Sequence, residues 1–127
     1  MKGYVGKIEE LTENNSNFRQ VLFTGKYCQL VVMSLKPKEE IGMEVHQQVD
    51  QFFRIEEGQA KVMIDGEEHL VGDGDAIIVP AGSQHNVINN SETEDLKLYT
   101  IYSPPNHPEG NIHQTREEAM AAEHEEH

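Results

Sequence analysis

The chain has 127 residues, enough for one domain with a single hydrophobic core and too few for two. It carries 10 basic and 23 acidic residues, so its formal net charge is −13. Because this charge repels phosphate backbones and anionic membranes, we expect neither nucleic acid nor a membrane as a partner. The sequence has no stretch of 18 apolar residues, and its first residues lack the apolar region of a signal peptide.

The single cysteine, Cys28, cannot form a disulfide within the chain, which fits the reducing conditions of the cytoplasm. Its apolar neighbours Leu30, Val31 and Val32 indicate a buried and unreactive thiol. We therefore expect a cytoplasmic protein in which Cys28 has no chemical role.

Short apolar runs separated by glycine, aspartate or asparagine make up most of the chain and are typical of β-strands. Residues 1–19 are polar and are interpreted as an N-terminal arm that precedes these runs. The predicted strands cover residues 21–23, 29–35, 43–46, 51–55, 60–64, 69–71, 76–79 and 96–102, and another strand opens at His85. Asp65-Gly66 is the dipeptide favoured by type I′ hairpin turns. The pattern predicts one all-β domain over residues 1–127, built as a sandwich or a barrel.

The last part of the chain, residues 103–127, has a different pattern. Three prolines keep residues 103–108 extended, because proline fixes its own φ and disfavours helix at the residue before it. Thr115 and Glu118 have the spacing of a capping box, and strong helix formers follow them. We expect an extended segment and then a short C-terminal helix packed on the outside.

A corner between two strands lies within residues 74–89. An apolar run ends at Pro80, Gly82 follows, and the next strand opens with His85. Proline cannot donate a hydrogen bond to a sheet and glycine permits positive φ, so these two residues predict a tight turn. The turn delivers the imidazole of His85 at the start of the returning strand.

Polar residues also occur at inward positions of two earlier strands. Glu44 and His46 are two residues apart, so they can share one face of a strand. Gln51 opens the next strand and shares a face with Phe53 and Ile55. Polar groups among such apolar side chains are costly unless something binds them, and a metal ion would do so.

The spacing around the corner resembles the second motif of the cupin superfamily. Its fixed positions correspond to Gly74, Pro80, Gly82, His85 and Asn89, and all of them match. The resemblance implies a single-domain antiparallel jelly-roll β-barrel, the double-stranded β-helix of cupins, with the short helix added at its C-terminus. It also implies a homodimer that pairs through sheet edges and outward apolar side chains.

The first cupin motif is matched less closely. His46 and the closing Gly58 match, whereas Glu44 stands where a histidine is usual and Gln51 where a glutamate is usual. Lys38 stands at the position of the leading glycine. The resemblance therefore implies one divalent metal ion held by four ligands, namely Glu44, His46, Gln51 and His85.

Two imidazoles and one carboxylate suit iron, manganese, nickel or zinc, and the sequence does not choose among these ions. Two alternatives remain open at this point. Glu44 and Gln51 could hydrogen-bond inside a cavity without any metal. A different register would use His46 as the first ligand, together with Gln48 and Asp50.

Two further side chains are candidates for acid–base catalysis. Tyr102 shares a strand face with Leu98 and Thr100, which predicts that it points inward, whereas Tyr99 points outward. His107 lies in the extended segment that could fold over the barrel mouth and bring it close to the metal. Tyr102 and His107 are therefore the candidate catalytic residues.

Cupins resembling this chain include dioxygenases, isomerases and lyases. The resemblance implies a metal-binding small cupin that acts as an enzyme on a small polar or phenolic molecule in the barrel. The metal would be a Lewis acid or, as iron, would activate oxygen. The main alternative is a non-catalytic module that binds a small molecule or a sugar, and a further one is a structural or storage protein with an empty site. No residue selects among these activities.

Overall fold

The computed structural model describes residues 2–125, so residues 126–127 of the predicted C-terminal segment lie outside the description. The strands are β1 (Arg19–Thr24), β2 (Gln29–Leu35), β3 (Glu44–Val45), β4 (Asp50–Glu57), β5 (Gln59–Ile64), β6 (Glu67–Gly72), β7 (Ala76–Val79), β8 (Gln84–Asn89), β9 (Leu96–Ser103) and β10 (Ile112–His113). The helices are α1 (Ile8–Asn14) and α2 (Arg116–Glu125). Every strand predicted from the sequence is present, with boundaries shifted by at most a few residues.

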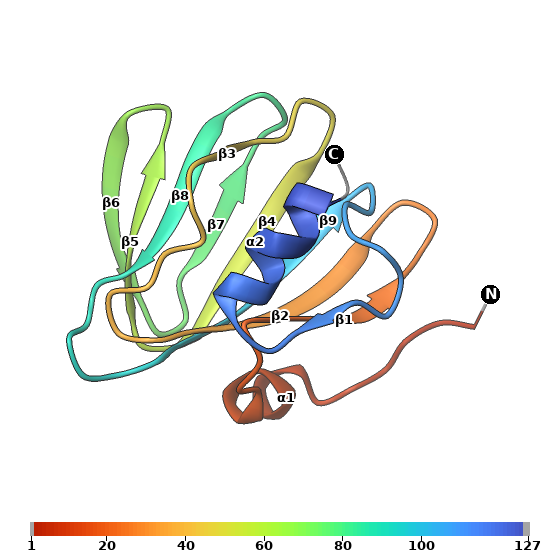
Figure 1. Ribbon diagram of the computed structural model, residues 1–127, viewed down its shortest axis with the longest axis horizontal. Coiled ribbons are helices and arrows are strands. Elements are labelled where there is room, and N and C mark those ends of the chain that lie inside the picture. The colour runs from red at the N-terminus through yellow and green to blue at the C-terminus, as the bar shows by residue number, and fades with distance from the viewer. Residues whose placement is uncertain (1, 126–127) are drawn as a thin grey trace.

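The strands form two antiparallel sheets that face each other as a jelly roll (Figure 1). One sheet has six strands in the order β10-β1-β2-β9-β4-β7, and the other has four in the order β3-β8-β5-β6. The predicted jelly-roll architecture is confirmed. The two sheets do not close into a continuous barrel, because no described strand of one sheet pairs with a strand of the other.

Alternation along the strands builds the core between the sheets. Phe53 and Ile55 of β4 and Leu98 of β9 are almost completely buried, and the residues between them face outward. Burying a large apolar side chain of this kind contributes roughly 1.5–3 kcal/mol to stability. Gln51 and Tyr102 are cross-strand partners on the same inward faces, nearer the end of the sheet. The core and the candidate site are therefore continuous.

The turns have the geometry that their sequences predict. Asp65 and Gly66 both adopt positive φ, 47° and 85°, as a type I′ hairpin requires. At Gly58 the backbone comes so close to the next strand connection that an added Cβ would lie 2.9 Å from the carbonyl oxygen of Asp95. The closing glycine of the first motif is thus required by close packing.

Helix α1 and the position of Cys28 differ from the sequence predictions. Residues 8–14 form a helix within the predicted arm, and this helix lies against β2, β4 and β9. The helix is short, and the acidic Glu9 and Glu10 in its first turn stabilise it. Cys28 is exposed, so the prediction of a buried thiol was wrong. It belongs to the turn between β1 and β2 and precedes the buried part of β2.

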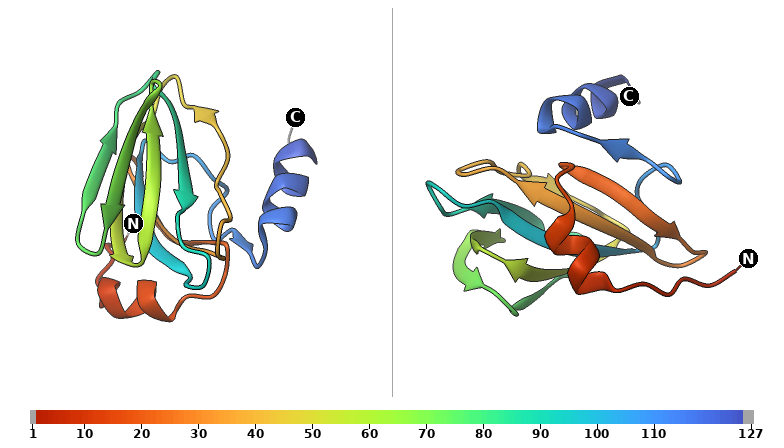
Figure 2. Two further views of the ribbon diagram at one scale, coloured as in Figure 1. Left: turned by 90° about the vertical axis from the view of Figure 1, so that its left-hand side faces the viewer. Right: turned by 90° about the horizontal axis from the view of Figure 1, so that it is seen from below.

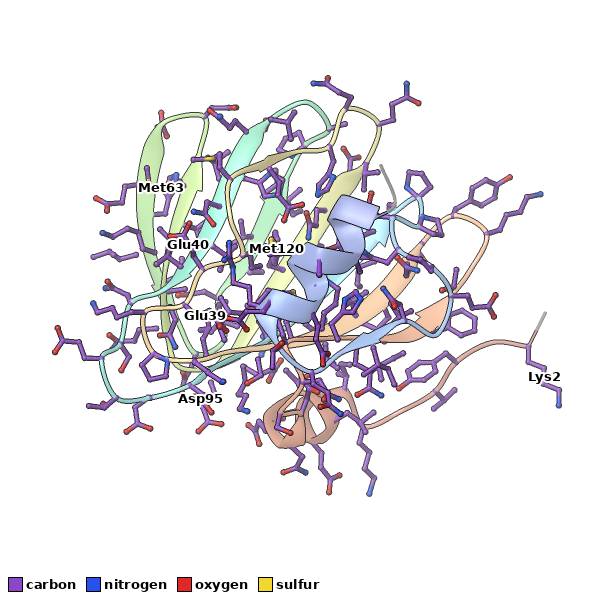
Figure 3. All side chains as sticks on the ribbon, viewed as in Figure 1. Lys2, Glu39, Glu40, Met63, Asp95 and Met120 are labelled. Carbon is purple, nitrogen blue, oxygen red and sulfur yellow. The ribbon has the colours of Figure 1, made fainter. Side chains whose placement is uncertain are left out.

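Helix α2 lies outside the sheets, as predicted, on the side where β3 and β10 are the outer strands (Figure 2). The amide of Glu118 donates to the side-chain oxygen of Thr115 at 3.2 Å, which caps the first turn. Ala119 is fully buried and Met120, labelled in Figure 3, packs against the core. The helix therefore covers one side of the jelly roll.

Neither helix among residues 2–125 is long and apolar enough to cross a membrane. Ile78 is exposed and Phe52 and Tyr99 are half-buried on the outer face of the six-stranded sheet. The homodimer expected from outward apolar side chains stays a prediction.

Candidate metal centre

The corner between β7 and β8 fixes the backbone that carries His46. The amide of Gly82, at a φ of 90°, donates to the carbonyl oxygen of His46 at 2.8 Å. The amide of Ala81 donates to the carboxylate of Asp50, also at 2.8 Å. Asp50 and Gln48 are both exposed, and Asp50 is engaged by the turn. The geometry therefore favours the register that uses Glu44 over the one that uses Gln48 and Asp50.

Three of the predicted ligands lie close together. Glu44 of β3 is the direct cross-strand partner of His85 of β8. The Oε2 atom of Glu44 lies 3.2 Å from Nε2 of His46, and the rings of His46 and His85 have centroids 5.4 Å apart. Segments that are about forty residues apart in the sequence thus meet at one end of the jelly roll.

The two imidazoles each have a nitrogen suited to a metal. Nδ1 of His85 lies 3.1 Å from the carbonyl oxygen of Ser83. This contact favours the tautomer in which Nδ1 donates and Nε2 keeps its lone pair. Nε2 of His46 is buried and, among the described residues, has no hydrogen-bond partner, because its contact with Glu44 lacks hydrogen-bond geometry.

Gln51 presents an unpaired acceptor in the interior. It is 3% exposed, and its Nε2 donates to the hydroxyl of Thr100 at 3.0 Å. Its Oε1 is buried and has no hydrogen-bond partner within the described part of the chain. A buried acceptor without a partner is costly, and a bound cation would satisfy it.

Glu44 is ionised in this environment. Burial on its own would raise the pKa of the carboxyl group. The contact with His46 and the charges of Arg19 and His85 outweigh burial and hold the pKa of Glu44 below its ordinary value. The site therefore offers a negatively charged oxygen at neutral pH.

The group of potential metal-binding side chains that lie closest together in the described chain is not the predicted ligand set. Among residues 2–125, the group of His, Cys, Asp or Glu whose ligand atoms all lie within 4.8 Å of one another is Glu9, Glu13 and Glu56. Glu9 and Glu13 are exposed. The ligand atoms of Glu44, His46 and His85 do not all lie within that distance of one another, so these side chains would have to approach one another to share an ion at metal–ligand distances of about 2.0–2.2 Å.

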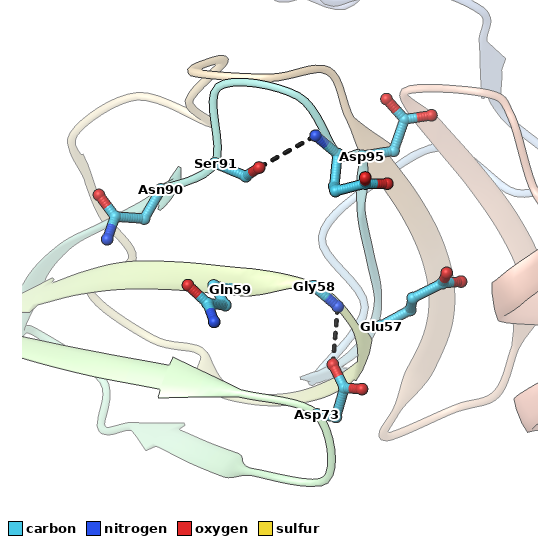
Figure 4. Close-up of a pocket in the computed structure, with 8 residues that line it drawn as sticks. Glu57, Gly58, Gln59, Asp73, Asn90, Ser91 and Asp95 are labelled. Carbon is cyan, nitrogen blue, oxygen red and sulfur yellow. Dashed lines mark hydrogen bonds between the residues drawn. The ribbon is translucent and has the colours of Figure 1, made fainter.

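A second acidic feature is a cavity of about 550 Å³ beside Gly58 (Figure 4). Its lining includes Glu57, Asp73, Glu94 and Asp95, and the carboxylate of Asp73 accepts the amide of Gly58 at 2.8 Å. It has no histidine in its lining, and none of the predicted ligands or catalytic residues lies there. The candidate metal centre is thus separate from this cavity.

The two candidate catalytic residues contact each other beside the centre. Tyr102 is 3% exposed, which places it in the interior as predicted, and its hydroxyl lies 3.1 Å from Nε2 of His107. The ring of Tyr102 lies edge-on to His46, with centroids 6.0 Å apart. A phenol and an imidazole in hydrogen-bond contact can relay a proton.

Sequence reasoning missed Gln29, the residue that holds His107 in place. Gln29 is fully buried, and its Oε1 accepts the amides of Asn106 and His107 at 3.0 and 2.9 Å. Its Nε2 donates to the carbonyl oxygen of His107 at 2.8 Å. These bonds tie the extended segment to β2. The only signal in the sequence was a glutamine at an inward position of an apolar strand.

Sequence reasoning also missed Arg19, which was assigned to the N-terminal arm. Arg19 opens β1, is 1% exposed and is the largest of the fully buried side chains. Its charge acts on both Glu44 and His107. A buried arginine at the start of a strand cannot be distinguished from a surface arginine by its sequence context.

His107 is expected to make stability depend on pH. Burial, with the charge of Arg19 next in importance, lowers the pKa of His107 from 6.5 to about 3. The unfolded chain takes up this proton below its ordinary pKa, whereas the folded chain does not. Protonation of the unfolded chain therefore does not reduce the unfolding free energy above pH 6.5. The reduction grows as the pH falls from 6.5 toward 3.

The variant His107→Gln should remove this dependence. With chelator present and below the ordinary histidine pKa, the unfolding free energy of the unmodified protein should fall more steeply with falling pH than that of His107→Gln. The difference in slope should be up to about 1.4 kcal/mol per pH unit. Urea denaturation between neutral and mildly acidic pH measures the difference. The exposed His69 gives the control His69→Gln, and equal slopes for all three proteins would contradict the prediction.

Comparison with known proteins identifies the family. A model of the cupin domain matches residues 31–102 of this chain. The chain belongs to the cupin family. The uncharacterized protein YrkC of Bacillus subtilis is 50% identical over 128 residues, which cover 96% of this cupin and 68% of YrkC. An uncharacterized protein of Acanthamoeba polyphaga mimivirus is 47% identical over 113 residues, covering 86% of this cupin and 70% of the viral protein.

A solved structure shows the same fold over nearly the whole cupin. The crystal structure of BH2720 from Bacillus halodurans superimposes with a TM-score of 0.92 and 42% sequence identity. The match covers 94% of this chain and 95% of the Bacillus halodurans chain. The two chains therefore share the fold over nearly their whole length.

Proposed function

We propose that this cupin binds one divalent transition-metal ion between Glu44, His46, Gln51 and His85. The buried and unpaired Oε1 of Gln51 is the observation that carries the proposal. The donor set supports it, because two imidazoles, one carboxylate and one amide oxygen leave coordination positions open for a substrate. With Gln51 in place of a glutamate, Glu44 supplies the charge that the usual carboxylate would.

We further propose that the site is catalytic and acts on a small polar or phenolic molecule. The bound ion would supply Lewis acidity or, as iron, redox chemistry with oxygen. The residues of the chain would bind and orient the substrate and exclude water from it. Tyr102 would donate or accept a proton at its hydroxyl, and His107 would orient that hydroxyl through Nε2.

Several features support a catalytic role over simple ligand binding. A binding module needs no acid–base group, whereas the hydroxyl of the buried Tyr102 contacts the half-buried His107 next to His46. Burial lowers the pKa of His107 to about 3, so the imidazole is neutral at pH 7 and can orient the hydroxyl of Tyr102 through Nε2 without carrying a charge of its own. Gln29 fixes the backbone of His107 at the cost of burying an amide side chain.

A substrate screen tests the catalytic role. The protein loaded with iron, manganese, nickel or zinc is incubated with sugars, enediols and catechols, and product formation and oxygen consumption are followed. Turnover that falls at least about tenfold in Tyr102→Phe supports the proposal. A metal-loaded protein that binds members of the panel without converting any of them is instead a binding module.

A further inference from the structure

Residues 104–111, which we call the strap, connect β9 to β10. In the sheet order β10-β1-β2-β9 these two strands are separated by β1 and β2, so the strap has to pass the ends of both (Figure 1). Most of its residues are exposed, and three of the eight are prolines, which have no amide hydrogen to donate. The strap therefore cannot be held to the sheet by a regular ladder of backbone hydrogen bonds.

The buried side chain of Gln29 holds the middle of the strap instead. Its Oε1 accepts the amides of Asn106 and His107, and its Nε2 donates to the carbonyl oxygen of His107. All three contacts are made with backbone atoms of the strap. Nε2 also donates to the hydroxyl of Thr24 at 3.0 Å, which fixes the amide group from the side of β1. Gln29 thus supplies the donor and the acceptor that a neighbouring strand would otherwise supply.

The strap closes over the candidate site. Gln29 and Tyr102 are cross-strand partners, and Tyr102 is in turn the partner of Gln51, so the three form one inward row near the end of the sheet. The ring of His107 lies edge-on to that of Tyr102, with centroids 5.0 Å apart. Tyr102 and Gln51 are both 3% exposed. A molecule from solution therefore reaches Tyr102 only when a covering segment moves.

We propose that the strap opens to admit a small molecule to Tyr102, and that Gln29 is the latch that sets how often it opens. Opening breaks the three hydrogen bonds to Gln29 and the contact between His107 and Tyr102. The prolines keep the strap stiff, so it moves as a unit between its two strand anchors. Gly110, at a φ of 70°, provides the turn next to β10. The identification of the admitted molecule as the substrate rests on the proposed function, whereas the opening does not depend on a metal.

Acetylation of tyrosine hydroxyls by N-acetylimidazole, mapped by mass spectrometry, tests whether Gln29 controls access to Tyr102. Gln29→Leu removes the hydrogen bonds to the strap, so Tyr102 should react at least about tenfold faster than in the unmodified chain. Thr24→Val is the matched control, because it removes the bond between Thr24 and Gln29 and keeps those to the strap. It should leave the rate unchanged, and an equal acceleration there would contradict the role of the latch. Tyr27 is 72% exposed and should react equally in all three proteins.

Hydrogen exchange of the unmodified chain tests the opening without a substitution, and it decides the matter if Gln29→Leu does not fold. The amides of Asn106 and His107 should exchange at least about tenfold faster than that of Val32 in β2, and low urea should not change their rate, because the strap opens without unfolding of the sheet. Equal exchange of the two groups, or equal acetylation of Tyr102 in Gln29→Leu and the unmodified chain, would overturn the proposal. Both measurements are made with chelator present, so absence of metal uptake or of turnover would overturn the proposed function alone.

Discussion

Elemental analysis of the purified cupin is expected to find close to one transition-metal ion per chain, and the double variant His46→Ala, His85→Ala should lose it. These imidazoles provide two of the four proposed donors. Nε2 of His46 has no hydrogen-bond partner among the described residues, and the Nδ1 contact of His85 leaves its Nε2 available. Without the two imidazoles, one carboxylate and one amide oxygen remain, and these bind first-row transition-metal ions weakly. Metal content after extensive dialysis measures the loss.

Two controls separate this site from other metal-binding groups. His69→Ala removes an exposed imidazole that contacts Glu67, and it should keep the metal. Glu13→Gln disrupts the acidic cluster of Glu9, Glu13 and Glu56, and it should also keep the metal. A double variant that retains a full complement of metal, or a loss in Glu13→Gln, would show that the ligands are misassigned.

The variant Asn89→Ala is expected to lower the unfolding free energy by about 3–5 kcal/mol. Asn89 is fully buried at the end of β8. Its Nδ2 donates to the carbonyl oxygens of Leu35, Lys36 and Glu94 at 3.1, 3.0 and 2.8 Å. Its Oδ1 accepts the amide of Ser91 at 3.0 Å. Truncation leaves buried backbone groups without partners, and urea denaturation reports the cost.

The neighbouring Asn90 provides the matched control. Its side chain is half-buried, and its backbone amide, which the substitution retains, donates to Gln59. Asn90→Ala should therefore change the unfolding free energy by no more than about 0.5 kcal/mol. If the two substitutions have equal effects, the hydrogen bonds of Asn89 do not stabilise the contact between the end of β2 and the loop before β9. On this account Asn89 of the second cupin motif is a structural residue.

The strand pattern was predictable because local rules determine it. Inward and outward residues alternate along β4 and β9, so the sequence indicated which side of each strand is buried. Asp65-Gly66 and the turn at Gly82 require positive φ, which few other residues adopt easily. The two motifs also indicated which polar side chains to consider, because buried polar groups stand out in an apolar strand.

The remaining features depend on contacts between distant segments. Gln29 is 78 residues from His107, and no local pattern connects them. Arg19 lay in a polar region, and β10, the strand paired with it, is about ninety residues away in the sequence. Helix α1 is stabilised mainly by the sheet on which it lies, so its short sequence carried little signal.

A crystal structure of the metal-loaded cupin, with anomalous scattering measured at the absorption edge of the bound element, would locate the ion. One anomalous peak is expected within about 2.0–2.2 Å of donor atoms from Glu44, His46, Gln51 and His85. A peak at the cluster of Glu9, Glu13 and Glu56 instead, or no peak between the four side chains, would contradict the proposed ligand set.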